Sequence, residues 1–127
     1  MGTDARGRDI QGMNTPEPSR GDIWDLELDP IRGREQAGFR PALILSVDLF
    51  NKGPAELVVV VPLTRTDRKI RWHVRMRPPE ADLAAESFVQ CENLRSVSKQ
   101  RLKRRRGRVS ADTLEQVEDR VRILLGL

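Results

Sequence analysis

The most restrictive feature of the sequence is a run of seven residues, Leu57 to Leu63, which reads Leu-Val-Val-Val-Val-Pro-Leu. β-Branched residues in such a run favour a strand that is buried on both of its faces. The run is the longest apolar stretch of the chain, yet it is far shorter than the roughly 20 residues that a membrane-spanning helix requires. We therefore expect a β protein built around this central strand, with no membrane segment.

Further strands are predicted by alternating or continuous apolar patterns between turn-forming residues. In Arg71–Arg77, for example, Trp72, Val74 and Met76 alternate with basic side chains and His73. Residues 51–54 (Asn-Lys-Gly-Pro) are typical of a turn. The other predicted strands are Ile23–Leu28, Phe39–Val47 and one or two short strands within Ser87–Val97.

The last part of the chain predicts one long amphipathic helix. Ser110 is a suitable N-cap residue, Val109 and Leu114 can form a hydrophobic staple, and Gly126 can end the helix. One apolar stripe is expected along it, made of Leu114, Val117, Val121, Leu124 and Leu125. The predicted fold is mainly β, a small, strongly bent antiparallel barrel capped by a C-terminal helix. Residues 1–19 are polar and aperiodic and are interpreted as a disordered leader, and residues 20–127 as one domain.

Positive charge is concentrated within the chain, whose net charge is +4. Residues 99–108 hold seven Lys and Arg side chains and no acid, and a second basic cluster spans residues 65–77. Such clusters favour a polyanion, with nucleic acid as the first candidate, although a solvated basic loop explains a charge run equally well. For the run at 99–108 we expect a contribution to affinity for RNA rather than to bond breaking.

Cysteine and histidine occur once each, as Cys91 and His73. A disulfide framework, a multi-cysteine zinc site and a histidine-rich metal centre are therefore excluded, and no cofactor is expected. We interpret Cys91 as a packed core residue and His73 as a structural or surface residue. One cysteine and the lack of a secretory signal in residues 1–20 favour a cytoplasmic protein.

The segment Arg32–Pro41 places a carboxylate, an amide and guanidinium groups beside glycines, directly before a predicted buried strand. Polar groups on a loop that is held by a rigid strand are a common way to build a site. An ordinary charged connector is the alternative interpretation.

Several motifs in the same order resemble the MazF/PemK family of bacterial toxins. They are Arg20–Trp24 (Arg-Gly-Asp-Ile-Trp), Leu28–Pro30, Gly33–Ser46, Val61–Thr64 and Glu92–Val97. The likeness spans about residues 20–125, which is essentially the whole domain. This family implies an SH3-like, MazF/PemK/CcdB-like barrel that forms a homodimer and acts as a metal-independent endoribonuclease on single-stranded mRNA. It also implies a cognate antitoxin whose flexible tail covers the RNA groove, with DNA contacted only through the antitoxin complex.

The resemblance also implies roles for individual residues. Arg40 matches the catalytic arginine of the family, Thr64 its catalytic threonine, and Glu35 a loop carboxylate that can orient the arginine or accept a proton. Arg34 stands where some members have histidine, so an acid–base role does not transfer to it, and we expect it to contact phosphate. The remaining residues expected to bind RNA are Gln36, Arg65, Glu92 and Asn93.

Three functions follow from these patterns. The first is a sequence-specific mRNA endoribonuclease toxin whose 2′-hydroxyl chemistry leaves 2′,3′-cyclic phosphate and 5′-hydroxyl ends. The second is a non-catalytic SH3-like module that binds RNA through its basic clusters. The third, a toxin of the same fold that poisons a protein such as gyrase, is disfavoured because that subfamily lacks the Glu-Gln-x-Gly-x-Arg-Pro loop.

Overall fold

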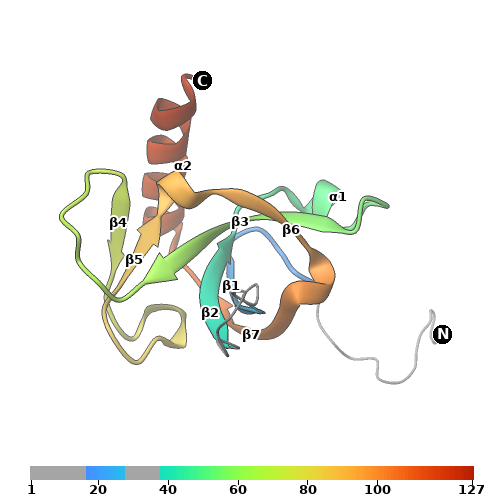
Figure 1. Cartoon of the computed structure of the whole chain (residues 1–127), viewed down its shortest axis with the longest axis horizontal. Helices are drawn as coiled ribbons and strands as arrows, with labels where there is room; N and C mark the ends of the chain where they lie inside the picture. The colour runs from blue at the N-terminus through green and yellow to red at the C-terminus, as the bar shows by residue number, and fades with distance from the viewer. Residues whose placement is uncertain (1–16, 28–37) are drawn as a thin grey trace, which may run out of the picture.

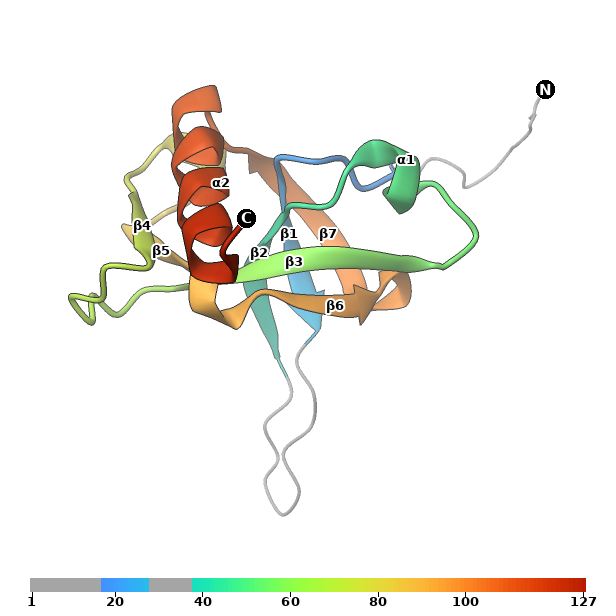
Figure 2. The same ribbon diagram turned by 90° about the horizontal axis from the view of Figure 1, so that it is seen from above.

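The fold is a strongly bent antiparallel sheet with one long helix packed across it (Figures 1 and 2). The computed structural model describes residues 17–27 and 38–127. In this part of the chain the strand order is β4-β5-β3-β2-β1-β7, and β6 pairs with the first half of β3. The strands are β1 (Asp22–Glu27), β2 (Phe39–Ile44), β3 (Leu57–Thr64), β4 (His73–Met76), β5 (Ser87–Gln90), β6 (Arg95–Ser98) and β7 (Leu102–Arg108). The helices are α1 (Asp48–Asn51), α2 (Ala111–Leu125) and three 3₁₀ turns, η1 (Glu80–Asp82), η2 (Cys91–Asn93) and η3 (Lys99–Arg101). The predicted mainly β fold with a C-terminal helix is confirmed.

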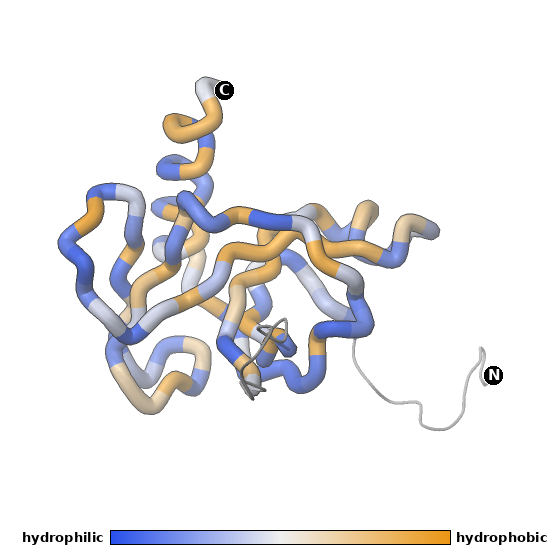
Figure 3. The backbone as a smooth tube through the Cα atoms, viewed as in Figure 1, coloured by the Kyte–Doolittle hydropathy of each residue, from blue (hydrophilic) through white to orange (hydrophobic). Residues whose placement is uncertain are grey.

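Both faces of the sheet are buried, which explains the continuous apolar run in β3. Alternate residues of β3 enter two different clusters: Val61 and Leu63 pack toward α2, whereas Val58 and Val60 pack inside the curl of the sheet. Figure 3 shows β3 as a hydrophobic strand through the middle of the molecule. Trp24 is buried in the second cluster, and Trp72 is partly buried against the first.

Helix α2 begins and ends at the predicted residues. The Ser110 hydroxyl accepts a hydrogen bond from the Thr113 amide at 3.1 Å, and Gly126 ends the helix in the left-handed conformation with φ of 75°. Val117 and Val121 are buried against the sheet. The predicted apolar stripe does not stay buried over its whole length, because Leu124 and Leu125 are 36% and 53% exposed.

The connection between β2 and β3 differs from the prediction. β2 ends at Ile44 rather than Val47, and a single helical turn, α1, precedes the expected turn at residues 51–54. The reason is local: the buried Asn51 side chain donates to the Ser46 carbonyl oxygen at 2.9 Å, and the Ser46 hydroxyl accepts from the Val59 amide at 2.9 Å. These contacts turn the chain before another strand residue can pair.

Most of the basic run at 99–108 is the strand β7, which follows the short turn η3, so the alternative interpretation as a solvated loop is wrong for residues 102–108. β7 pairs with β1, whose acidic side chains face the cations. Three acids of β1 and Glu17 contact six of the seven cations, and the seventh, Arg101, donates to the Glu27 carbonyl oxygen at 3.0 Å. The ion pairs are Asp22 with Arg105 and Arg108, Asp25 with Arg104 and Arg106, Glu27 with Lys103, and Glu17 with Lys99.

Asp22 is the centre of this arrangement and is only 1% exposed. One carboxylate oxygen accepts a hydrogen bond from Arg108 Nη1 at 2.9 Å and forms an ion pair with Arg105 Nε at 3.2 Å. The other accepts from the Ser19 amide at 2.9 Å and from the Trp24 indole at 3.3 Å. The Val109 amide donates to the carbonyl oxygen of Gly21, the residue before Asp22. This hydrogen bond extends the contact between the two ends of the chain from β7 to the residue just before α2.

We predict that Asp22→Asn lowers the free energy of unfolding by about 2 kcal/mol, because a buried charge pair loses one partner while the amide still fills the space. Denaturation by urea measures the change. Asp119→Asn is the matched control, since Asp119 is half exposed on α2, pairs with Arg122 at 2.9 Å and should change stability by less than about 0.5 kcal/mol. Equal effects of the two substitutions would contradict this account of Asp22.

Candidate active site

Arg40 lies near the start of β2, and Thr64 is the last residue of the neighbouring strand β3. The ladder between β2 and β3 pairs Ala42 with Pro62, and no pair is recorded beyond it on this side. Arg40 lies two residues before Ala42 and Thr64 lies two residues after Pro62, so both extend beyond the same end of this ladder. There Thr64 pairs with Phe88 of β5. On its other side Arg40 pairs with Leu26 of β1, so the backbone of Arg40 is held within the sheet.

The two side chains are available for a ligand. Arg40 is exposed, and its guanidinium makes no hydrogen bond or ion pair with any residue of the described part of the chain. The Thr64 hydroxyl accepts from the Thr66 amide at 3.2 Å, which leaves its own proton free to be donated. A guanidinium beside a hydroxyl donor is an arrangement that suits a phosphate group.

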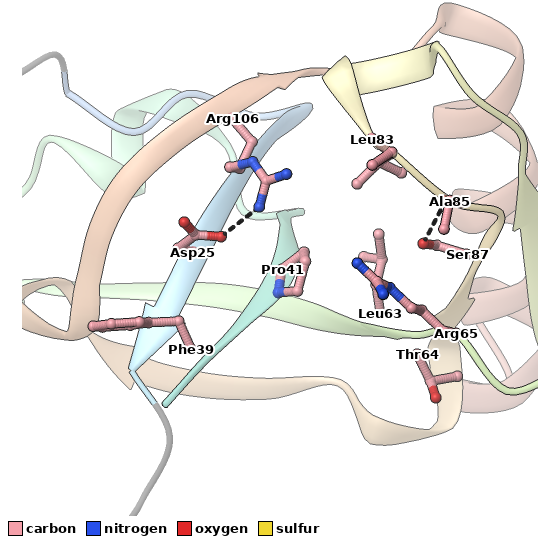
Figure 4. Close-up of a pocket in the computed structure, with 11 residues that line it drawn as sticks. Asp25, Phe39, Pro41, Leu63, Thr64, Arg65, Leu83, Ala85, Ser87 and Arg106 are labelled. Atoms are coloured by element: carbon pink, nitrogen blue, oxygen red, sulfur yellow. Dashed lines mark hydrogen bonds and ion pairs between the residues drawn. The ribbon is translucent and has the colours of Figure 1, made fainter. Parts of the chain in front are cut away.

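A pocket of about 360 Å³ opens beside these strand ends (Figure 4). Thr64 and Arg65 line it, together with the residues on either side of Arg40, namely Phe39 and Pro41. Figure 4 shows Asp25 and Arg106 on one side of the opening and Arg65 and Ser87 on the other, with Pro41 and Leu63 between them. Arg106 Nη1 donates to Asp25 Oδ1 at 3.0 Å.

The far wall of the pocket comes from the segment after η1. Leu83, Ala84 and Ala85 line it. η1 packs against β7 at Gly107, where a Cβ atom would lie only 2.9 Å from the carbonyl carbon of Ala81. Glycine at this position therefore allows the wall to approach the strand that carries Arg106.

Glu92 and Asn93 lie in η2, at the opposite end of β5 from the pocket residue Ser87. Glu92 contacts His73 Nε2 at 2.8 Å. The His73 side chain is only 4% exposed, although strand alternation predicted that it would face solvent. A structural position for His73 agrees with our interpretation. Within one protomer, Glu92 and Asn93 are thus separated from Arg40, Thr64 and Arg65.

Three of the sequence-predicted residues, Arg34, Glu35 and Gln36, lie outside the described residues. The structure in turn adds residues that the sequence patterns did not single out. These residues come from four strands and are Asp25, Phe39, Arg106 and Ser87. Among them, only Asp25 stands out from a strand pattern, as a polar residue between the apolar Trp24 and Leu26.

Cys91 is completely buried in the core below α2. Burial raises the pKa of its thiol to about 12, with a smaller contribution in the same direction from Glu92. The thiol is therefore neutral over the physiological range, and Cys91 is not a nucleophile. In residues 17–27 and 38–127, no three His, Cys, Asp or Glu side chains gather in a group that could hold a metal ion. No helix in these ranges is long and apolar enough to cross a membrane.

Comparisons with known proteins place the chain among toxins. The family model described as "PemK-like, MazF-like toxin of type II toxin-antitoxin system" matches residues 19–125. Endoribonuclease MazF9 of Mycobacterium tuberculosis is 35% identical over 113 residues, which cover 85% of this chain and 96% of the relative.

Solved structures agree with this relationship. A MazE–MazF crystal structure from Deinococcus radiodurans superposes with a TM-score of 0.77 at 28% identity, covering 89% of this chain and 99% of that one. An endoribonuclease in complex with its cognate antitoxin, from a mycobacterial species, gives a TM-score of 0.70 at 29% identity, with 87% and 96% coverage.

We predict that Cys91 reacts slowly with a thiol reagent in the native protein at pH 8. A pKa of about 12 in place of 9.0 lowers the thiolate fraction about 1,000-fold, and burial blocks access as well. Labelling with a chromogenic disulfide in buffer and in concentrated guanidinium measures the difference. Between about pH 9 and 12 the Cys91 thiol ionises only in the unfolded chain. The free energy of unfolding should therefore fall as the pH rises through that window. Rapid labelling of the native protein would show that the thiol is accessible.

Proposed function

Since the chain belongs to the PemK-like, MazF-like family of endoribonuclease toxins of type II toxin–antitoxin systems, we propose that it cleaves single-stranded mRNA at short sequences without a metal ion. In the proposed reaction the 2′-hydroxyl oxygen attacks the adjacent phosphorus, and the bond from phosphorus to the 5′-oxygen breaks. The products are a 2′,3′-cyclic phosphate and a 5′-hydroxyl end. Cleavage of mRNA inhibits translation and growth, and the proposed compartment is the cytoplasm.

The observation that carries this proposal is that Arg40 and Thr64 lie at the same end of the ladder between β2 and β3, two residues beyond its Ala42–Pro62 pair. We assign to the Arg40 guanidinium the stabilisation of negative charge on the crowded phosphorane, and to the Thr64 hydroxyl a hydrogen bond to the same group. A base must take the proton of the 2′-hydroxyl and an acid must protonate the leaving 5′-oxygen. Glu35 is proposed either as the base or as a carboxylate that orients Arg40.

RNA binding is proposed to extend beyond the reacting phosphate. Arg65 lies next to Thr64 and lines the pocket, so it is well placed for a neighbouring nucleotide. Arg34 and Gln36 are proposed to contact RNA from the segment before β2. For Glu92 and Asn93 the proposal requires that the RNA extend to η2, where the buried His73 holds the Glu92 carboxylate.

We propose a homodimer as the active form and a cognate antitoxin as its partner, with DNA contacted only through that complex. The antitoxin follows from relatives that were solved as MazE–MazF and as an endoribonuclease with its cognate antitoxin. The dimer is supported by the exposed apolar end of α2, where Leu125 and Leu127 line a groove of about 380 Å³. Sedimentation at micromolar concentration should give the mass of two chains, and a monomer alone would contradict the proposal.

The reaction is tested with a single-stranded RNA and its copy that has one 2′-deoxy nucleotide before the cleaved bond. We expect cleavage of the RNA in EDTA, a cyclic phosphate on the product, and no cleavage at the deoxy position, because only the 2′-hydroxyl supplies the nucleophile. Binding of both strands without cleavage of either would favour the non-catalytic RNA-binding module.

We predict that Arg40→Ala lowers the single-turnover cleavage rate by about 100- to 1,000-fold, because it removes a charged donor to the transition state. RNA affinity should fall much less, since other cations still contact the phosphate backbone. Single-turnover kinetics, RNA titration and thermal melting separate these effects. Lys52→Ala, an exposed change after α1 that also removes one positive charge, is the matched control and should cleave normally. Near wild-type cleavage by the Arg40 variant would show that Arg40 is not catalytic.

A further inference from the structure

We propose that the pocket between β1, β2, β3 and β7 binds one unpaired nucleobase next to the cleaved phosphate and sets the base preference at that nucleotide. This inference rests on the proposed function and adds a specificity-determining site that is made chiefly of Asp25, Arg65 and Phe39.

The position of the pocket ties it to the reacting phosphate. Thr64 itself lines the pocket, as do Phe39 and Pro41 on either side of Arg40 and Arg65 directly after Thr64. The pocket therefore lies at the same two strand ends as the residues proposed to contact the reacting phosphate. A nucleotide whose phosphate contacts Arg40 and Thr64 can place its base in this pocket.

The shape of the pocket suits a single flat ring system. Its volume of about 360 Å³ lies at the small end of the range for small-molecule sites, roughly 300–1,000 Å³. Pro41 and Leu63 supply an apolar floor between the polar walls. The Phe39 side chain is 59% exposed at the rim, which is unusual for a large aromatic residue and leaves a ring face for base stacking.

The polar groups supply both an acceptor and donors. The Asp25 carboxylate has one oxygen on Arg106 at 3.0 Å and the other 3.7 Å from Arg104, which leaves lone pairs for a further donor. Arg65 has no hydrogen bond or ion pair with another residue of the described part of the chain, and Arg106 uses only Nη1 in its contact with Asp25. Arg106 Nε is buried and has no partner there.

This set of groups matches the pairing edge of a base, where a donor lies beside an acceptor. Guanine and uracil offer a ring N–H beside a carbonyl oxygen, and adenine and cytosine offer an amino group beside an unprotonated ring nitrogen. In each case the N–H group can donate to the Asp25 carboxylate while its neighbour accepts from a guanidinium. The carboxylate only accepts and the guanidinium only donates, so the two groups together fix the orientation of the base. Unpaired RNA bases are commonly recognised through these edges together with stacking on aromatic rings.

The pocket is also preorganised by the fold. The side chains of Asp25 and Arg106 are only 17% and 22% exposed, and the ladder between β1 and β7 holds both strands in place. Their orientation is therefore set before RNA binds, so the cost of ordering them on binding is small.

The experiment is cleavage of a randomised single-stranded RNA pool by the full chain, followed by sequencing of the ends that carry a 5′-hydroxyl. One of the two nucleotides that flank the cut should show a base preference in the sequenced ends. Asp25→Asn should reduce that preference by about 10-fold and leave the other positions unchanged, because an amide both donates and accepts. Phe39→Leu should slow cleavage with all four bases at that nucleotide without changing the preference.

Arg65→Gln tests the proposal independently of folding, because Asp25 also pairs with β7. It should weaken the same base preference, whereas Asp119→Asn, on the distant helix α2, should leave the profile unchanged. Flanking nucleotides without any base preference, or an unchanged profile in the Asp25 and Arg65 variants, overturn the pocket while cleavage itself upholds the proposed function. If the Asp25 and Arg65 variants keep the wild-type cleavage profile but bind the antitoxin more weakly, the pocket is a binding site for the antitoxin and not for a base. Absence of any cleavage by the wild-type chain would instead overturn the proposed function.

Discussion

The buried carboxylate of Asp22 is the contact on which most of the architecture depends. It contacts Arg105 and Arg108 of β7 and the backbone of Ser19, so a single side chain joins the first strand, the last strand and the segment that enters the sheet. A buried carboxylate is costly without partners, so the arrangement is stable only when β7 lies in register beside β1. That register also positions β2, because β1 pairs with β2 along its full length. The pairing of β1 with β2 therefore fixes the position of the strand end that carries Arg40.

The same ladder between β1 and β7 links the fold to function. Asp25 and Arg106 are a second ion pair of the ladder, and they form one wall of the pocket beside Thr64. The concentrated positive charge of β7 is consequently offset by acids of β1, and its first role is to hold the strand in place. Cations that contact acids in this way are partly neutralised, so the field that reaches an RNA is smaller than the sequence composition suggests.

Features that depend on neighbours in the sequence were predicted well. The β3 run, the alternation in β4 and both ends of α2 follow from local periodicity and capping, and all are confirmed. The β7 strand was interpreted as a loop because its partner acids lie about 80 residues away, and no local pattern indicates that pairing. The sequence left His73 as either a structural or a surface residue, because its burial depends on Glu92 and on the packing of η2. Arg40 and Thr64 were singled out by family resemblance, and their place at the same end of the ladder between β2 and β3 follows only from the register of the two strands. The pocket joins five strands and a loop, so its residues could not be predicted as a group.

The central claim is that Arg40 and Thr64 act together on one phosphate at the end of the sheet. A double-mutant cycle tests it most directly, with single-turnover RNA cleavage measured for Arg40→Ala, Thr64→Val and the variant that carries both changes. Groups that stabilise the same transition state as a unit are strongly non-additive. The account predicts that the double variant loses far less activity than the product of the two single losses. A double variant whose loss equals that product would show that the two side chains act independently, and would contradict the shared site.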